Sequence, residues 1–343
     1  MSKFIQLFCF CLIFSCAKTS YLIEQGIGQV GLEWKAQNND RVLMDPQVSE
    51  EHKEKIRLIE KAKEYFYKYF DVEPTGIYDE TTFLDSDAVT YLVIVSPKDK
   101  VEAVKVSFPI VGSFPYLGFF KKTSAETYRN KKEKQGFSTY MRKVYAYSTL
   151  NQWIFDDNIL SSFFQLKDRQ LVELIFHELV HTHIFISNDV SFNESFAEVI
   201  SKNLARKYYE DDEKKTAQLK LNQKKSREIL ELIVLKTSEL NEMYRGVKDH
   251  EAALSEFLEN DFRPAMKSKC RELDLTHCWP LKESWNNARF AAFSTYSAKQ
   301  NRIESLFVKS NKSLKEFFHW IQKKYGSFEG DGKFLTFLER EIY

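Results

Sequence analysis

The chain has 343 residues and a mass of 40.5 kDa, with 50 Lys and Arg against 49 Asp and Glu. This balance argues against nucleic-acid binding through bulk charge, and no nucleic-acid partner is expected. Glycine and proline are scarce, at 11 and 7 residues, so the chain is expected to be rich in helix. The length allows two domains, or one large domain with a helical extension.

The N-terminus has the features of an export signal. An apolar run over residues 4–14 is too short to cross a bilayer but suits a signal peptide. Residues 13–16, Ile-Phe-Ser-Cys, resemble the lipobox of bacterial lipoproteins. We expect residues 1–15 to be removed and Cys16 to be acylated, which would anchor an exported protein in the bacterial cell envelope. Ala17 favours the outer membrane, facing the periplasm or the exterior. An ordinary cleaved signal and a retained short anchor are the alternatives.

The first half of the mature chain alternates between helical and strand patterns. Apolar residues at helical spacing predict amphipathic helices over residues 21–34 and 50–70. A β-branched run over 91–95, a turn and an apolar segment over 101–111 predict a β-hairpin. A charged surface helix over 124–135 and a strand over 144–147 follow.

The second half is expected to be helical. Asp168 is a candidate N-cap for a helix that is apolar nearly all round and therefore buried, and Ser191 opens the next helix. Residues 210–262 are dense in Lys and Glu and predict a long helical hairpin whose charge is a solvated face. The tail is expected to form helices over 281–296, 302–325 and 334–343. The predicted organisation is a signal over 1–15, a catalytic region over 16–205 and a helical C-terminal region over 206–343.

Cys270 and Cys278 are the cysteines left after export, with seven residues between them. A disulfide that closes this short loop would contribute about 2–3 kcal/mol to stability. A metal site that includes His277 is the alternative, but it lacks a fourth ligand nearby.

The chemistry of the chain centres on His177-Glu178-Leu179-Val180-His181. Two histidines four residues apart lie on one helical face, so both imidazoles can reach one metal ion, while Glu178 can face the same cavity. This HExxH pattern predicts one Zn²⁺ per chain.

A zinc site with an open position needs a third protein ligand, and Glu194 is the candidate. Twelve residues separate it from His181, enough for a loop and a return onto a second helix. Ser191 and Glu194 also fit a capping box, which is the competing explanation. Glu198, one turn further, is expected to orient a ligand histidine, and Asn193 is expected to support the ligands.

These motifs resemble known metallopeptidases. The helix 177–181 followed by Asn193-Glu194-x-x-Ala197 is similar to the gluzincins, whose third zinc ligand is a glutamate on the next helix. A closer resemblance is to a bacterial family of predicted aminopeptidases, through segments within 108–120, 146–161 and 173–197. The resemblance covers roughly Tyr21 to Leu204. It implies an α+β, predominantly α-helical fold with a zincin-like core, a small N-terminal hairpin or sheet and a long helical C-terminal half.

The resemblance implies a zinc-dependent peptidase, expected to be an aminopeptidase acting on peptide substrates. Glu178 would take a proton from the zinc-bound water and deliver it to the leaving amine. Tyr147 is the expected donor to the oxyanion, with Tyr145 and His183 as further candidates, although the tyrosines could simply pack. The alternative function is a non-catalytic surface lipoprotein with a structural or inactive metal site and a partner-binding helical hairpin.

Overall fold

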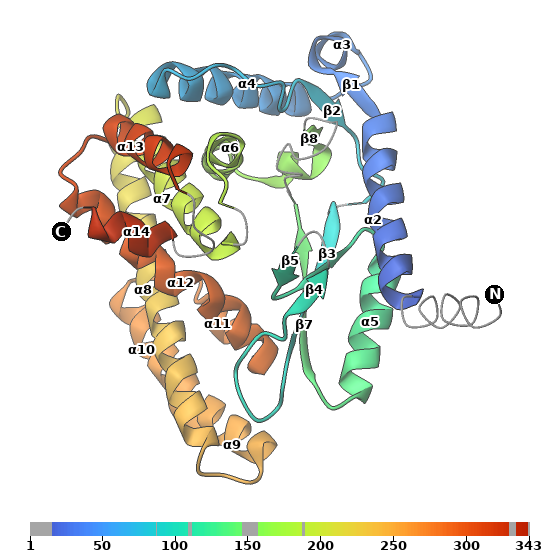
Figure 1. Cartoon of the computed structure of the whole chain (residues 1–343), viewed down its shortest axis with the longest axis vertical. Helices are drawn as coiled ribbons and strands as arrows, with labels where there is room; N and C mark the ends of the chain where they lie inside the picture. Colours follow the sequence, from blue (N-terminus) through green and yellow to red (C-terminus); the bar gives the residue numbers. More distant parts are fainter. Residues whose placement is uncertain are drawn as a thin grey trace, which may run out of the picture.

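A computed structural model describes residues 16–86, 88–108, 112–145, 157–186, 189–328 and 334–341. Figure 1 shows helices around small sheets, with α2 and α5 at one edge and α13 and α14 at the other. The predominantly helical α+β class predicted from the sequence is confirmed. The N-terminal residues 1–15, which include the predicted signal, lie outside the described residues. Within the described ranges, no helix combines the length and the apolarity that crossing a membrane requires.

The two predicted N-terminal helices are present. Helix α2 spans Cys16–Trp34, and α4 spans Glu50–Phe70 with Ser49 as its N-cap. Between them lie β1 (Ala36–Asn38) and the short helix α3 (Asn39–Met44). One face of α4 is fully buried and belongs to the main hydrophobic core. The helical spacing of apolar residues was therefore sufficient to find both elements.

Strand β3 (Thr90–Ser96) is the centre of the main sheet and is buried along its whole length. It pairs antiparallel with β6 (Leu117–Phe119) on one side and β7 (Ser138–Val144) on the other, in the order β6-β3-β7. Helix α5 (Lys122–Lys134) covers the face that carries Val93, and α12 (Asn287–Lys309) covers the face that carries Ile94. Both faces of β3 are thus closed by helices from distant parts of the chain.

The predicted hairpin between residues 91–95 and 101–111 is wrong. Among the described residues of the segment 101–111, one backbone hydrogen bond returns to the strand, from Val104 N to Val95 O at 2.8 Å, and no strand pairing between this segment and β3 follows. Residues of that segment instead form β4 (Val106–Phe108), which pairs with β5 (Gly112–Phe114). The long strand β7 supplies the backbone partners that the buried β3 requires, and it ends where the predicted strand 144–147 was expected to begin.

A second small sheet lies beside the main one and has the strand order β1-β2-β8. Strand β2 (Glu80–Thr82) pairs antiparallel with β1 and parallel with β8 (Ile159–Leu160). A 3₁₀ helix over Ser161–Gln165 then leads into the central helices. This sheet was not predicted, because its strands have only two or three residues each.

The C-terminal half is helical, as expected. Helix α8 (Glu213–Tyr244) is followed by α9 (His250–Phe257), a π-helical turn over Leu258–Phe262, α10 (Arg263–Glu272) and α11 (Trp279–Lys282). The predicted hairpin is therefore present, but its second arm continues ten residues beyond Phe262. A disulfide joins Cys270 to Cys278 and links α10 to the start of α11.

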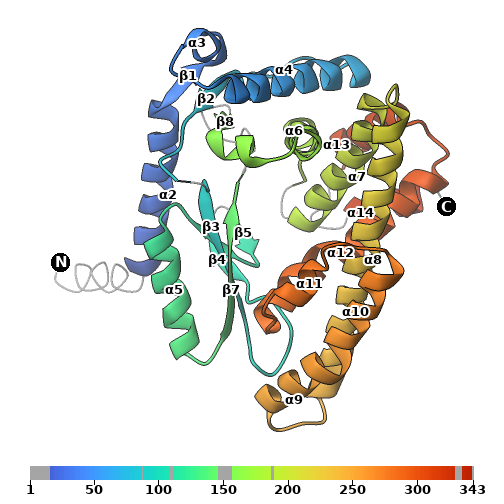
Figure 2. The ribbon, with the colours of Figure 1, turned by 180° about the vertical axis from the view of Figure 1, so that it is seen from behind.

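The last helices return to the main core. Helix α12 ends at Lys309, and α13 (Leu314–Gly326) and α14 (Phe334–Arg340) follow. Phe317 and Phe318 of α13 are fully buried in the same hydrophobic cluster as α4. Figure 2, viewed from behind, shows α13 next to α7. Helix α13 is distant in sequence from α2 and α4.

Candidate metal centre

Helix α6 (Asp168–His183) carries the HExxH pattern and runs through the centre of the molecule. Its buried apolar residues cover about half of its circumference and include Leu171, Phe176 and Val180. Packing against α4 and α7 holds the helix in one orientation. The helix begins at Asp168 with Lys167 at its N-cap, one residue earlier than predicted.

Helix α7 (Val190–Tyr208) packs against α6 and brings the second part of the site. Its N-cap is Asp189, whose carboxylate accepts a hydrogen bond from Phe192 N at 3.1 Å. The competing capping box is therefore wrong, because Ser191 lies inside the helix and Glu194 is beyond its first turn. The Glu194 carboxylate is not needed to cap the helix and faces α6 instead.

His177, His181 and Glu194 converge on one point. His177 Nε2 lies 3.2 Å from His181 Nε2 and 3.4 Å from Glu194 Oε2. His181 Nε2 lies 3.5 Å from Glu194 Oε1, and one ligand atom from each residue lies within 4.8 Å of the others. The structure thus brings together the three residues that the sequence proposed.

The spacing of these atoms fits a tetrahedral metal ion. Ligand bonds of roughly 2.0–2.1 Å at tetrahedral angles place neighbouring donor atoms about 3.3 Å apart. The two imidazole nitrogens are 3.2 Å apart, which matches that value, and each lies 3.4–3.5 Å from a different oxygen of the Glu194 carboxylate, which therefore faces both rings. Two imidazoles and a carboxylate are also a donor set that zinc prefers. His177, His181 and Glu194 can therefore bind a metal ion.

The charges of the site are strongly coupled. Burial lowers the pKa of His177, but its hydrogen bond to Glu194 and the charges of Glu178, Glu194 and Glu198 outweigh this and raise it to about 9. Burial and the nearby His177 lower the pKa of His181 to about 4. Burial alone would raise the pKa of Glu194, yet the two histidines bring it below its usual range. The raised pKa of His177 and the lowered pKa of Glu194 both reflect the attraction between the imidazolium and the carboxylate, and metal binding requires both histidines to be unprotonated.

Glu198 lies on the outer side of His177, as expected from the sequence. Its Oε2 is 3.8 Å from His177 Nδ1, and its Oε1 accepts a hydrogen bond from Lys202 Nζ at 2.6 Å. Lys202 fixes the carboxylate, and the carboxylate's charge faces the imidazole nitrogen that points away from the metal group. His181 Nδ1 is buried and has no hydrogen-bond partner within the described residues.

Glu178 is 7% exposed and adjoins a buried phenol that the sequence did not indicate. Burial and the charges of Glu194 and Asp157 raise the pKa of Glu178 to about 7, against the opposing effect of His177. Tyr78 is 1% exposed, and its hydroxyl has no hydrogen-bond partner among the described residues. Burial, together with the charges of Glu178 and Asp157, raises the pKa of Tyr78 well above its usual value. Tyr78 therefore belongs to the surroundings of the site.

Asn193 has a different role from the one expected. Its Oδ1 accepts a hydrogen bond from Ile186 N at 2.8 Å, and its Nδ2 donates to Ile186 O at 2.9 Å. Both polar ends of the buried amide thus bind the connection between α6 and α7. Asn193 holds the connection between α6 and α7 and so positions the backbone of the adjacent Glu194. Its amide binds the loop backbone instead of a ligand side chain.

The proposed oxyanion donors fare differently. His183 points into the aromatic core, with its ring 5.7 Å from Phe66 and 6.2 Å from Phe318, so its expected role is wrong. The reason is its position on α6, which turns it away from the face of His177 and His181. Tyr145 is 39% exposed. Tyr147 lies outside the described residues.

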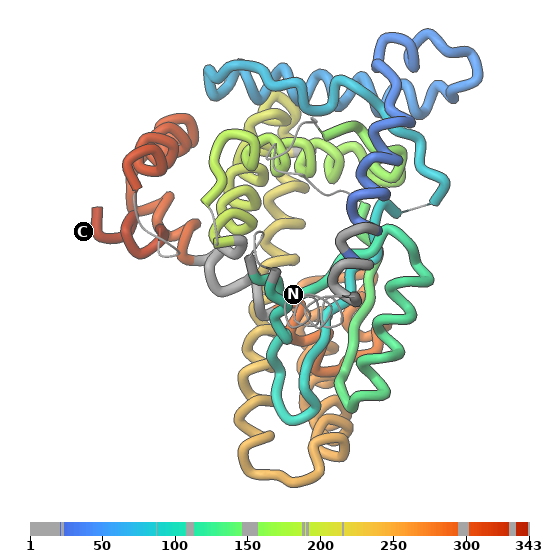
Figure 3. The backbone as a smooth tube through the Cα atoms, turned by 45° about the vertical axis from the view of Figure 1, so that its right-hand side comes forward, coloured from blue at the N-terminus to red at the C-terminus, as the bar shows by residue number. Residues whose placement is uncertain are grey.

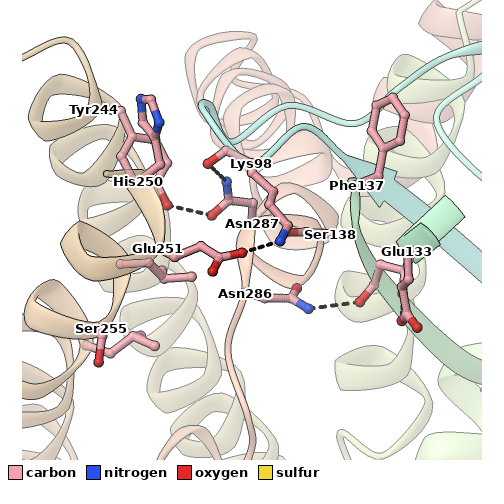
Figure 4. Close-up of a pocket in the computed structure, with 13 residues that line it drawn as sticks. Lys98, Glu133, Phe137, Ser138, Tyr244, His250, Glu251, Ser255, Asn286 and Asn287 are labelled. Atoms are coloured by element: carbon pink, nitrogen blue, oxygen red, sulfur yellow. Dashed lines mark hydrogen bonds and ion pairs between the residues drawn. The ribbon is translucent and has the colours of Figure 1, made fainter. Parts of the chain in front are cut away.

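A cavity of about 400 Å³ lies away from the metal group, and its lining includes residues of β7, α8, α9 and α12. Figure 4 shows that several polar groups in it bind one another. Asn287 accepts from Tyr244 Oη at 2.7 Å and donates to Lys98 O at 3.0 Å, and Lys98 forms an ion pair with Glu251. These bonds tie the C-terminal helices to the turn after β3.

A family model described as "Putative aminopeptidase" matches residues 20–327. The chain belongs to this family. The match extends well past Leu204, where the resemblance of the sequence motifs ended, and so includes most of the C-terminal helices. Searches of curated proteins and of solved structures found no match. The matched region includes all three residues of the group that can bind a metal ion.

Proposed function

We propose that the protein is a zinc-dependent peptidase of the gluzincin type, with a zincin-like core formed by α6 and α7. The observation that carries this proposal is the convergence of His177, His181 and Glu194, with Glu178 buried beside them on the same helix. The family description supports peptide substrates and an aminopeptidase preference.

His177, His181 and Glu194 would hold the zinc ion. When bound, zinc supplies a water of lowered pKa and polarises the peptide carbonyl. Glu178 accepts the proton of the attacking water and passes it to the leaving amine. Its buried position excludes bulk water from that transfer, and Glu198 keeps the ring of His177 in place.

The oxyanion that develops needs a hydrogen-bond donor in addition to the metal. Tyr147 stays the proposed donor from the sequence, and Tyr145 the second. The structure adds Tyr78 as a phenol close enough to feel the charge of Glu178. Because its hydroxyl is buried and has no hydrogen-bond partner in the part of the chain that the structure describes, Tyr78 is well suited to hold the Glu178 carboxyl in position once a proton has moved.

Metal analysis and paired variants test this function. The purified protein should contain about one zinc per chain, and Glu178→Gln should keep the zinc while hydrolysis of a peptide panel falls by roughly 10²–10⁴-fold. Glu194→Ala should lose the zinc. Glu242→Gln is a matched control, because Glu242 is exposed and pairs only with Arg245 three residues on. A folded protein that binds no zinc would overturn the proposal.

Peptides with free and blocked N-termini separate an aminopeptidase from an endopeptidase. An aminopeptidase should hydrolyse the free form and spare the blocked form. The non-catalytic lipoprotein is the less favoured alternative, since a structural metal ion has no use for a buried acid such as Glu178 next to its ligands. We further propose that the enzyme is exported and anchored in the cell envelope by a lipid on Cys16.

A further inference from the structure

The outward face of α2 has the polarity of a protein interior. From Glu24 to Trp34 the exposed residues are Gly26, Ile27, Val30, Gly31 and Trp34, and none has a polar side chain. Ile27 is 66% exposed, Val30 47% and Trp34 88%. A surface helix normally turns its charged residues outward and its apolar residues toward the core. Helix α2 therefore presents to its surroundings the face that other helices bury.

The polar residues of α2 are instead engaged with the protein. Glu24 accepts a hydrogen bond from Lys121 N at 3.2 Å, and Gln25 Nε2 donates to Gly118 O at 3.1 Å. Glu33 accepts from Asn158 Nδ2 at 3.3 Å. These bonds, spread over almost three turns, fix the rotation of the helix about its axis. The apolar face cannot turn inward without breaking them.

Close packing holds α2 in the same orientation. A Cβ atom on Gly28 would lie 2.2 Å from Phe120 Cδ2, so the helix backbone touches the end of β6 at this point. By contrast, a Cβ atom on Gly26 or Gly31 would have no neighbour within 4 Å. Figures 1 and 2 place α2 at the outer edge of the molecule, opposite α13 and α14, and Figure 3 turns it forward.

The helix that carries this apolar face begins at the predicted lipid attachment site. Cys16 and Trp34 are 18 residues apart, which is about five whole turns, so they occupy the same side of the helix. Ile27 lies within about 20° of that line. The residues before Cys16 are the apolar run 4–14. With either a lipidated Cys16 or a retained short anchor, the bilayer is directly at the start of this face.

We infer that the outward face of α2 lies on a lipid bilayer, with the helix parallel to the membrane surface. Ile27 and Val30 enter the boundary between headgroups and acyl chains, and Trp34 anchors the far end of the helix at the interface. The lipid and this face together hold the protein in one orientation, which directs α13 and α14 away from the membrane. This inference rests on the proposed membrane anchor at the N-terminus and is independent of the proposed peptidase activity.

Fluorescent labelling tests the orientation directly. The full chain, extracted from the membranes of an expressing bacterium, is reconstituted on vesicles of phosphatidylethanolamine and phosphatidylglycerol. An NBD probe is attached to Ile27→Cys, and in a separate protein to Val308→Cys. Val308 is the matched control, because it is also an exposed aliphatic residue, at 72%, but lies on α12. Doxyl-labelled lipids should quench the probe at position 27 and leave the probe at position 308 unaffected.

A second measurement uses vesicle flotation. The variant Ile27→Asn/Trp34→Gln should bind vesicles at least roughly tenfold more weakly than the unchanged chain, equivalent to about 1.4 kcal/mol. The control Leu235→Asn/Val308→Asn, on α8 and α12, should bind as the unchanged chain does. Equal quenching at positions 27 and 308 would overturn the inference. So would a dimer that forms through Ile27 and Trp34 and keeps the probe at position 27 out of reach of the doxyl-labelled lipids.

Discussion

The hydrogen bonds of Asn193 lead to a testable prediction about how the connection between α6 and α7 positions the metal ligands. The residue is 1% exposed, and its amide makes both hydrogen bonds to the backbone of Ile186, which is 3% exposed. Asn193→Ala would leave the buried N–H of Ile186 without its partner, whereas Ile186 O would keep the hydrogen bond from Asp189 N at 3.3 Å. An orphaned buried N–H costs roughly 1–3 kcal/mol, so the free energy of unfolding should fall by at least about 1 kcal/mol.

The same change should also weaken metal binding. Glu194 follows Asn193 directly, so a loosened connection between α6 and α7 lets its carboxylate drift from the two imidazoles. Urea unfolding followed by circular dichroism measures the stability, and competition with a chelator measures zinc retention. We expect both to decrease in Asn193→Ala.

Asn203 provides a control on the same helix. Its Nδ2 donates to Val199 O at 2.7 Å, four residues back, within α7. Asn203→Ala leaves the connection between α6 and α7 intact and should cost less than about 1 kcal/mol. If Asn193→Ala unfolded at the same urea concentration as the unchanged protein, the stabilising role of the hydrogen bonds between Asn193 and Ile186 would be refuted.

Three further predictions concern single side chains. Tyr78→Phe removes a buried hydroxyl that has no hydrogen-bond partner among the described residues. The free energy of unfolding, measured by thermal denaturation, should rise by about 1 kcal/mol while peptide turnover falls. A loss of stability would contradict this prediction. Burial raises the pKa of Glu173 above 4.5, so ionisation of this carboxyl destabilises the folded protein as the pH rises beyond that value. Glu173→Gln should therefore be more stable than the unchanged protein at pH 7 but not at pH 4. Denaturant titrations at both pH values test this. The methyl group of Gly28→Ala would collide with Phe120, so this change should lower the free energy of unfolding by at least about 1 kcal/mol. Gly26→Ala has free space and should raise it by about 0.5–1 kcal/mol. Equal melting temperatures of the two variants would refute the packing of α2 described above.

The contacts that surround the metal group could not be predicted from the sequence. Tyr78 lies 100 residues before Glu178, in a loop with no pattern of its own, and only the fold brings its phenol close to that carboxyl. The pairing of β3 with β7 was also missed. A buried apolar strand predicts that partners exist, but its pattern does not say which segment supplies them.

The sequence alone determined the features that depend on local backbone geometry. The bounds of α4 and the common face of His177 and His181 follow from the helical repeat of 3.6 residues. The spacing to Glu194 also allowed its return onto α6. Only the tertiary structure decided which side of each element is covered. In the folded protein His183 packs in the aromatic core, Asn193 binds the loop backbone, and the apolar side of α2 faces outward. These outcomes could not be predicted locally, because burial depends on neighbours that are distant along the chain.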